Sequence, residues 1–238
     1  MENATYATLT RQSGLMGELR AIANNIANSS TTGFRREGVI FDEHVRSLGP
    51  EEPSLSMAGA DGRLIDLGQG PLVQTGGSFD FAIEGAGFFL VETPQGNQLT
   101  RAGSFSRSPE GALVTADGHR LLDAGGSAVF APPDAAEIAL SGDGTLSADG
   151  NPVARIGLWN AASPDRLIHV SGTRYAVVGE PVPQEEAQLF QGFLEGSNVS
   201  PVEEIARMIE VQRGYELGQS FLDREDERIR SVIRTFSR

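Results

Sequence analysis

The chain has 238 residues, 32 acidic and 19 basic, and a net charge of −13 at pH 7; this length suits one large or two small domains. Fifteen acidic and six basic side chains lie between residues 77 and 199, so the middle lacks the basic stripe that binds nucleic-acid phosphates. No apolar run approaches the roughly 18 residues of a membrane-spanning helix, and residues 1–30 lack the basic start and apolar core of a cleavable secretory signal. We therefore expect no nucleic-acid partner, no membrane span and no cleavable signal peptide.

The sequence contains no cysteine, and all 19 basic residues are arginine. The lack of cysteine excludes disulfides, a thiolate nucleophile and cysteine-ligated metal sites. The lack of lysine excludes a Schiff base and the lysine of a phosphate-binding loop.

The first predicted element is a helix over residues 1–30. Its apolar positions recur at steps of three and four, which is the pattern of a helix that packs lengthwise against another helix. These positions are Leu9, Met16, Leu19, Ala23 and Ile26, with a polar layer at Gln12 in the same row. A joint over residues 27–36 should end the helix, because its Asn, Ser and Thr side chains compete for backbone hydrogen bonds and Gly33 can adopt a positive φ.

Residues 31–76 are predicted to form an extended connecting arm, because they carry many Gly and Pro residues and few apolar clusters. Residues 77–193 change to short runs rich in β-branched and aromatic residues, such as Phe88–Glu92 and Val153–Trp159. Tight-turn dipeptides such as Asp117-Gly118 separate these runs. The pattern predicts an antiparallel all-β central domain, and it leaves the strand order open.

The last predicted element comprises residues 194–238, a returning segment followed by a helix from Ser200. Ser200 is a suitable N-cap, Pro201 fits the first helical position, and Glu203 completes a capping box. An apolar row then recurs every seventh residue: Met208, Tyr215, Leu222, Ile229 and Phe236. Two companion rows remain possible, one through Gln212, Gln219, Asp226 and Ile233 and the other through Val211, Gly218, Glu225 and Val232.

The two terminal helices are therefore predicted to pair as a coiled coil, with the β-rich domain between them in the sequence. The seam contains polar layers, and Gly214 and Gly218 each cost a helix about 1 kcal/mol, so the pair should be weak in isolation. A weak helix pair of this kind is stabilised when copies pack side by side. The pattern thus favours a subunit that polymerises, and the overall prediction is a mainly β protein with terminal α-helices.

The candidate chemical motifs have simpler structural interpretations. Gly85-Ala86-Gly87 resembles a dinucleotide-binding turn, but a strand follows it where that motif needs a helix. Asp143, Asp149 and Asn151 do not have the spacing of a calcium-binding loop. Asp42-Glu43-His44 is better explained as a solvated polar run. We expect no catalytic, cofactor-binding or metal site, and hence no enzyme.

Three stretches resemble the flagellar rod and hook family. Ile22–Arg35, with the sequence IANNIANSSTTGFR, is similar to its N-terminal signature, and Leu194–Glu204, with the sequence LEGSNVSPVEE, is similar to its C-terminal signature. Phe79–Gly87, together with Thr100–Phe105 and Leu113–Gly118, is similar to its central motif. The start of the chain, its length and the C-terminal motif most resemble proximal-rod members.

The resemblance implies a structural subunit of the periplasmic part of the flagellar basal body, exported by the flagellar type III apparatus. Its partners would be other proximal and distal rod proteins, copies of itself and the export apparatus. The terminal helices (1–30 and 200–238) would form the inner tube of the rod, which transmits torque. A distal-rod subunit and a coiled-coil adaptor of the basal body remain the alternatives, and an enzyme such as a wall hydrolase is a third class that no carboxylate pair supports.

The same resemblance implies an assembly interface in the two signatures and the helix seam. The N-terminal residues would fix the turn out of the first helix and contact neighbouring subunits, and the C-terminal residues would do so where the chain returns. The expected interface residues are Leu9, Met16, Leu19, Asn24, Asn25, Ile26, Asn28, Thr32, Gly33, Phe34, Ser197, Asn198, Pro201, Ile205, Met208, Gln212, Tyr215, Leu222 and Ile229.

Overall fold

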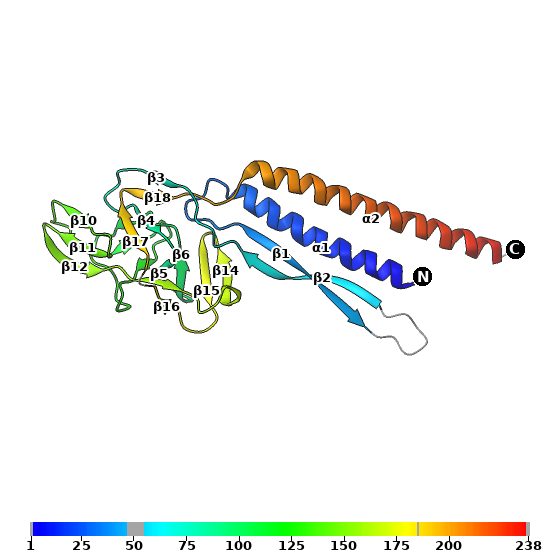
Figure 1. Cartoon of the computed structure of the whole chain (residues 1–238), viewed down its shortest axis with the longest axis horizontal. Coiled ribbons are helices and arrows are strands. Elements are labelled where there is room, and N and C mark those ends of the chain that lie inside the picture. The colour runs from blue at the N-terminus through cyan, green and yellow to red at the C-terminus, as the bar shows by residue number, and fades with distance from the viewer. Residues whose placement is uncertain (1, 47–54, 185, 237–238) are drawn as a thin grey trace. The chain divides into compact units, whose positions relative to one another are not determined.

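The computed structural model describes residues 2–46, 55–184 and 186–236, and the chain divides into two compact units (Figure 1). The helical unit comprises Met1–Ala27, Glu37–Asp66 and Ser200–Arg238. The β-unit comprises Asn28–Arg36 and Leu67–Val199. Each unit is thus built from segments that are distant in the sequence.

Two helices lie side by side in the helical unit, α1 (Glu2–Ala27) and α2 (Pro201–Phe236) (Figure 1). They run antiparallel, since Asn25 near the end of α1 contacts Glu204 at the start of α2, whereas Gln12 contacts Tyr215 about three turns further along α2. The start of α2 at Pro201 agrees with the Ser200 and Pro201 signals in the sequence. Neither described helix is both long and apolar enough to cross a membrane.

The face of α2 that turns toward α1 combines two heptad rows. Val211 is buried and Met208, Tyr215 and Leu222 are half-buried. Gly218 belongs to the same face: a Cβ built there would lie 3.3 Å from the side chain of Gln12. The structure therefore selects the companion row through Val211 and Gly218, and the glycines that weaken the isolated helix allow α1 to approach closely.

α1 buries only part of the row that the heptad pattern predicts. Gln12 of that row is buried, but Leu9 is 47% exposed and Met16 37% exposed, while Glu18, Ile22 and Asn25 outside the row are buried. The difference arises because a second element, a β-hairpin, also packs on α1. The choice of buried face thus depends on two neighbours, which the sequence pattern of one helix does not contain.

This hairpin pairs β1 (Glu37–Arg46) with β2 (Leu55–Ile65) in antiparallel register, with a bulge between Ile40 and Asp42. The sequence predicts an extended arm over residues 31–76, and its pattern does not reveal that two segments of this arm pair with each other. Pairing satisfies the backbone groups of two extended segments that have little apolar sequence of their own. Contact with α1 then gives the hairpin a surface to pack on.

The β-unit contains four antiparallel sheets formed by short strands. The largest has the order β14-β15-β6-β5-β9-β8-β7, with β13 paired to both β5 and β16; β10-β11-β12, β17-β4 and β18-β3 form the others. The strands are β3 (Leu72–Gln74), β4 (Phe81–Glu84), β5 (Phe88–Thr93), β6 (Gly96–Thr100), β7 (Ser106–Arg107), β8 (Leu113–Val114), β9 (Arg120–Leu121), β10 (Ile138–Leu140), β11 (Thr145–Ala148), β12 (Asn151–Arg155), β13 (Leu158–Asn160), β14 (Leu167–Ser171), β15 (Arg174–Val177), β16 (Val182–Pro183), β17 (Gln188–Gln191) and β18 (Phe193–Glu195). A short 3-10 helix, η1 (Pro164–Arg166), precedes β14.

The antiparallel, mainly β class with a helix near each terminus agrees with the sequence analysis. The strand order, which the sequence leaves open, includes two long-range pairs, β3 with β18 and β4 with β17. These pairs bring the chain that enters the β-unit beside the chain that leaves it. The core of the β-unit packs between its strands and consists of Phe81, Ile83, Phe89, Val91, Phe105, Leu113, Leu121, Val129, Ala131, Leu146, Ile156, Leu158 and Leu189.

Candidate functional site

Within the helical unit, Asn25 from the N-terminal signature joins three elements. Its side chain is fully buried. Its Nδ2 donates to the carbonyl oxygen of Glu37 at 2.8 Å and to Oε2 of Glu204 at 3.1 Å, and its Oδ1 accepts from the Glu37 N–H at 2.9 Å. Asn25 thus satisfies both backbone groups at the start of β1 and ties them to the first turn of α2. We call Asn25, Glu37 and Glu204 the helical clasp.

We expect Asn25→Ala to lower the free energy of unfolding of the helical unit by about 2–3 kcal/mol, because it leaves buried polar groups without partners. Thermal unfolding followed by far-ultraviolet circular dichroism measures this, since both long helices lie in the helical unit. Gln212→Ala, at an exposed position of α2, is the control and should change the midpoint little. Equal midpoints for the two variants would contradict the role of the clasp.

The end of the N-terminal signature makes a tight turn inside the β-unit. The N–H of Gly33 donates to the carbonyl oxygen of Glu195 at 2.7 Å, and the ring of Phe34 is fully buried. Gly33 has a φ of +73°, and a Cβ at this position would lie 2.3 Å from the backbone nitrogen of Ala102. Asn28 accepts a hydrogen bond from the Thr31 hydroxyl at 3.1 Å, which closes the turn locally.

A buried carboxylate, Glu195, holds two buried arginines in the β-unit. Its Oε1 accepts from Arg35 at 2.6 Å and from the N–H of Gly70 at 2.9 Å, and its Oε2 accepts from Arg101 at 2.9 Å. All three charged side chains are at most 3% exposed. We call Glu195, Arg35 and Arg101 the ionic clasp.

Arg101 also binds the backbone and a ring. It donates to the carbonyl oxygens of Ile83 and Gly85, and its guanidinium lies 5.4 Å from the ring centre of Phe88. Burial above all, together with the charge of Arg35, lowers the pKa of Arg101 to about 10 against the attraction of Glu195. Arg101 therefore stays cationic near neutral pH, and one carboxylate faces two cations.

The C-terminal signature contributes backbone contacts to the same unit. Oδ1 of Asn198 accepts from the Arg36 N–H at 2.7 Å, and its Nδ2 donates to the carbonyl oxygen of Gly68 at 2.9 Å. The Ser197 hydroxyl accepts from the Val199 N–H at 3.2 Å. Asn198 and Ser197 thus hold the returning chain beside the outgoing chain within the β-unit.

The expected interface residues therefore fall into two groups. Asn25, Gly33, Phe34 and Ser197 are buried within the subunit, where their contacts stabilise the fold. Half-buried positions are Leu19, Asn24, Ile26, Asn28, Thr32, Asn198, Met208, Tyr215 and Leu222. Exposed positions are Leu9, Met16, Pro201, Ile205, Gln212 and Ile229.

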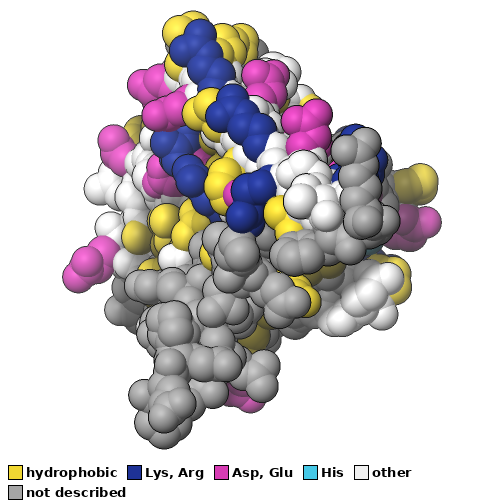
Figure 2. All heavy atoms as spheres, turned by 90° about the vertical axis from the view of Figure 1, so that its right-hand side faces the viewer, with side chains coloured by type: hydrophobic (Ala, Val, Ile, Leu, Met, Phe, Trp, Pro, Cys, Tyr) yellow, Lys and Arg dark blue, Asp and Glu magenta, His cyan; other side chains and the backbone are white. Residues whose placement is uncertain are grey.

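The exposed group gives the helical unit apolar surface. Ile205 and Ile229 are each 50% exposed. Figure 2 shows hydrophobic side chains between arginine and acidic side chains on the face that carries the helix ends. An open groove of about 440 Å³ also lies between the helices, lined by residues that include Leu15, Leu217 and Phe221.

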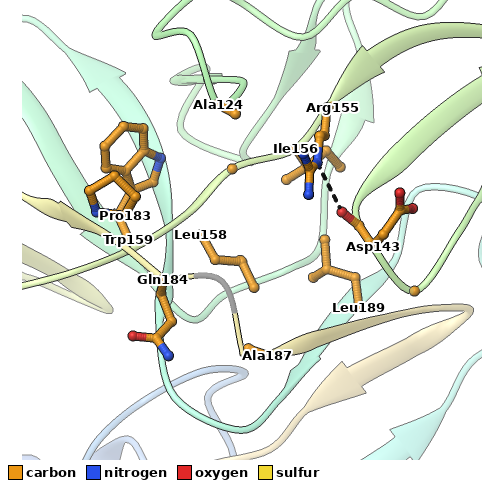
Figure 3. Close-up of a pocket in the computed structure, with 12 residues that line it drawn as sticks. Ala124, Asp143, Arg155, Ile156, Leu158, Trp159, Pro183, Gln184, Ala187 and Leu189 are labelled. Atoms are coloured by element: carbon orange, nitrogen blue, oxygen red, sulfur yellow. Dashed lines mark hydrogen bonds between the residues drawn. The ribbon is translucent and has the colours of Figure 1, made fainter.

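The β-unit contains a pocket of about 180 Å³ (Figure 3). Its walls include Leu158, Trp159 and Leu189, and Nε of Arg155 donates to the backbone carbonyl of Asp143 rather than to its carboxylate. Among the residues that the structure describes, no group of three or more His, Asp or Glu side chains is arranged to hold a metal ion. The Asp42-Glu43-His44 run lies outside the residues whose side chains are described.

Sequence reasoning missed the charged members of both clasps. Arg35 and Glu195 stand inside the quoted signatures, but their mutual contact spans 160 positions of sequence. Arg207 of α2 also donates to Glu18 of α1 at 2.7 Å, and this hydrogen bond raises the pKa of Arg207. The signal in the sequence was a charged residue within each signature, Arg35 in IANNIANSSTTGFR and Glu195 in LEGSNVSPVEE.

Family models match three parts of the chain. The model described as flagella basal body rod protein matches residues 9–35, the FlgE/F/G D1 domain of flagellar hook protein matches residues 82–148, and the C-terminal domain of flagellar basal body rod FlgEFG protein matches residues 191–235. The first match contains Asn25 and Arg35, the second contains Arg101, and the last contains Glu195 and Glu204.

Relatives match over nearly the whole chain. The flagellar basal-body rod protein FlgF of Caulobacter vibrioides is 38% identical over 98% of this chain and 97% of its own length. FlgF of Mesorhizobium japonicum is 37% identical over 91% of this chain and 90% of its own length, and the rod protein FlgG of Bacillus subtilis is 28% identical over 98% of both. The chain therefore belongs to the flagellar basal-body rod protein family, as a structural rod subunit most like FlgF.

Proposed function

We propose that this chain is a subunit of the proximal rod that polymerises through its helical unit, with copies of itself and with other proximal and distal rod proteins as neighbours. The observation that carries the proposal is that apolar side chains of α1 and α2 remain exposed after the two helices have paired. α1 and α2 bury one apolar face on each other and leave further apolar side chains, such as Leu9, Met16 and Ile205, exposed. Exposed apolar surface of this kind is typical of a subunit that is completed by its neighbours.

The paired helices act as a coiled coil in this proposal. The supporting observations are the continuous heptad row of α2 and the close approach at Gly218. We assign the assembly surface to the exposed and half-buried residues of the two helices. The buried signature residues, including Asn25 and Gly33, hold each subunit in the shape that presents this surface.

The proposal places the subunit in the periplasm after export by the flagellar apparatus, with no enzymatic activity. FlgF relatives with 33–38% identity support the proximal assignment over the distal one, since the FlgG relatives are 28–32% identical. A distal-rod subunit is the second candidate within the family, and a coiled-coil adaptor of the basal body is a candidate outside the rod.

Electron microscopy of basal bodies from a strain that lacks this gene tests the proposal. We expect rods that are absent or that stop within the proximal section, and restoration of complete rods by the wild-type gene. Complete rods and hooks in the deletion strain would contradict a proximal role. Rods that contain the proximal section but lack the distal one would support the distal candidate instead.

We expect Leu222→Asp to abolish motility while the β-unit remains folded. Leu222 is half-buried on the face of α2 that packs on α1, and an aspartate there places a charge in the seam. Swarming on soft agar measures assembly, and Trp159, the single tryptophan, reports the fold of the β-unit by fluorescence. Leu222→Met keeps the volume and apolar character and should retain motility; normal motility of Leu222→Asp would count against the seam.

A further inference from the structure

The pocket of the β-unit shown in Figure 3 has an apolar part that belongs to the core. Ile156, Leu158 and Leu189 line the pocket, and each side chain is at most 7% exposed. All three are members of the hydrophobic core of the β-unit, so packing against their core neighbours fixes their positions. The pocket therefore offers a rigid apolar surface of preformed shape.

Trp159 brings a hydrogen-bond donor to the same pocket. Its Nε1 is buried, and no acceptor for it lies among the residues that the structure describes. An indole N–H can only donate, and buried polar groups of this kind normally have a partner. In Figure 3 the nitrogen lies on the edge of the ring that faces the other lining residues. Trp159 therefore presents a donor that a bound acceptor can use.

Arg155 contributes a positive charge to the pocket. Its side chain is exposed, its Nε donates to the backbone carbonyl of Asp143 at 3.3 Å, and within the described part of the chain its guanidinium forms no ion pair. The carboxylate of Asp143 accepts from the N–H and the hydroxyl of Thr145 at 3.1 and 3.0 Å, and it points away from the other lining side chains in Figure 3. The remaining N–H groups of Arg155 can therefore bind an anion.

We propose that this pocket binds a small aliphatic carboxylate, which is either a free acid or the C-terminal residue of a peptide. The carboxylate accepts hydrogen bonds from Arg155 and from Nε1 of Trp159, and the aliphatic part packs on the apolar lining. A guanidinium binds a carboxylate more strongly than it binds a neutral acceptor, because both partners are charged. The inference does not rest on the proposed assembly of the rod, since the pocket lies wholly within the β-unit.

The volume of the pocket limits the size of the ligand. An apolar cavity of about 150 Å³ holds a molecule of the size of benzene, and this pocket measures about 180 Å³. Isocaproate, whose branched chain resembles a leucine side chain, has a comparable size. Nucleotides and other drug-sized ligands occupy pockets of about 300 Å³ or more, so they are too large for this one.

Titration of the full chain with isocaproate tests the proposal. Trp159 is the single tryptophan of the sequence, so its fluorescence and its indole N–H signal in nuclear magnetic resonance spectra both report on this pocket. We expect saturable binding, with a downfield shift of the indole proton because Nε1 gains an acceptor. Isocaproamide has the same shape without the charge, and it should bind several-fold more weakly.

A substitution of Arg155 tests the role of its charge. Arg155→Gln should weaken the binding of isocaproate about tenfold or more, because it removes a charged hydrogen-bond donor. Arg155 is exposed, so the variant should fold, and circular dichroism checks this. The matched control is Arg120→Gln: Arg120 is also exposed, its partner is Glu92 at 3.6 Å, and it does not line the pocket. This control should bind isocaproate like the unchanged chain.

A short peptide that ends in leucine identifies the source of the carboxylate. Tighter binding of this peptide than of isocaproate, with no binding of its C-terminal amide, would assign the pocket to a peptide C-terminus. Binding of isocaproate but not of the peptide would assign it to a free acid. The proposal is overturned if neither acid produces a saturable change at Trp159, if isocaproate and isocaproamide bind equally, or if Arg155→Gln binds isocaproate as tightly as Arg120→Gln does.

Discussion

Replacing Glu195 by glutamine is expected to lower the free energy of unfolding of the β-unit by about 3–5 kcal/mol. Glutamine keeps the size of the side chain but removes the only carboxylate of the ionic clasp. Arg35 and Arg101 would then be two buried cations without a counter-charge. Their mutual repulsion, which already lowers the pKa of Arg101, would no longer be offset.

Urea unfolding followed by Trp159 fluorescence measures this loss, because Trp159 lies in β13 of the β-unit. Glu92→Gln is the matched control: its partner Arg120 lies 3.6 Å away, and both side chains are more than half exposed. The control should change the stability by less than about 1 kcal/mol. Adding Arg35→Met to Glu195→Gln should recover part of the stability, since it removes one of the two buried charges; equal midpoints for Glu195→Gln and Glu92→Gln would contradict the role of the clasp.

Replacing Gly33 by alanine is expected to destabilise the β-unit by about 3 kcal/mol or more, from two causes that add. The φ of +73° is unfavourable for any L-residue, and the new Cβ would lie 2.3 Å from the nitrogen of Ala102 and 2.4 Å from the carbonyl carbon of Arg101. Backbone atoms cannot rotate away as a side chain can. The turn must therefore open, which weakens the hydrogen bond from Gly33 to Glu195.

Gly76→Ala separates the two causes. Gly76 also has a φ of +73°, but no atom lies within 4 Å of its added Cβ. It should cost about 1–2 kcal/mol, which is the conformational part alone. The same urea unfolding measures both variants, and equal losses would show that the close approach to Ala102 does not matter.

Local sequence determined much of the fold. Ser200 and Pro201 placed the start of α2, and Gly33 marked a turn that needs a positive φ. Dipeptides such as Asp117-Gly118 divided the middle of the chain into short antiparallel strands. These features depend on the conformational preferences of a few neighbouring residues, so they can be read without the rest of the chain.

The two signatures can be identified in the sequence, but the sequence does not show what their side chains contact. The buried partner of Arg35 is Glu195, and that of Asn25 includes the backbone of Glu37. A heptad pattern showed that α2 needs a partner, yet two companion rows fitted equally well. The structure selects the row with Gly218 because α1 approaches α2 there.

What the sequence alone determined is the antiparallel, mainly β class, the helix near each end and the family signatures. What only the tertiary structure decided is the pairing of β1 with β2, the buried face of α1 and the charges enclosed by the two clasps. The physical reason is the range of the interactions. Caps, turns and heptad rows act over a few residues, whereas burial and ion pairing depend on side chains that are distant in sequence and meet only when the chain is folded.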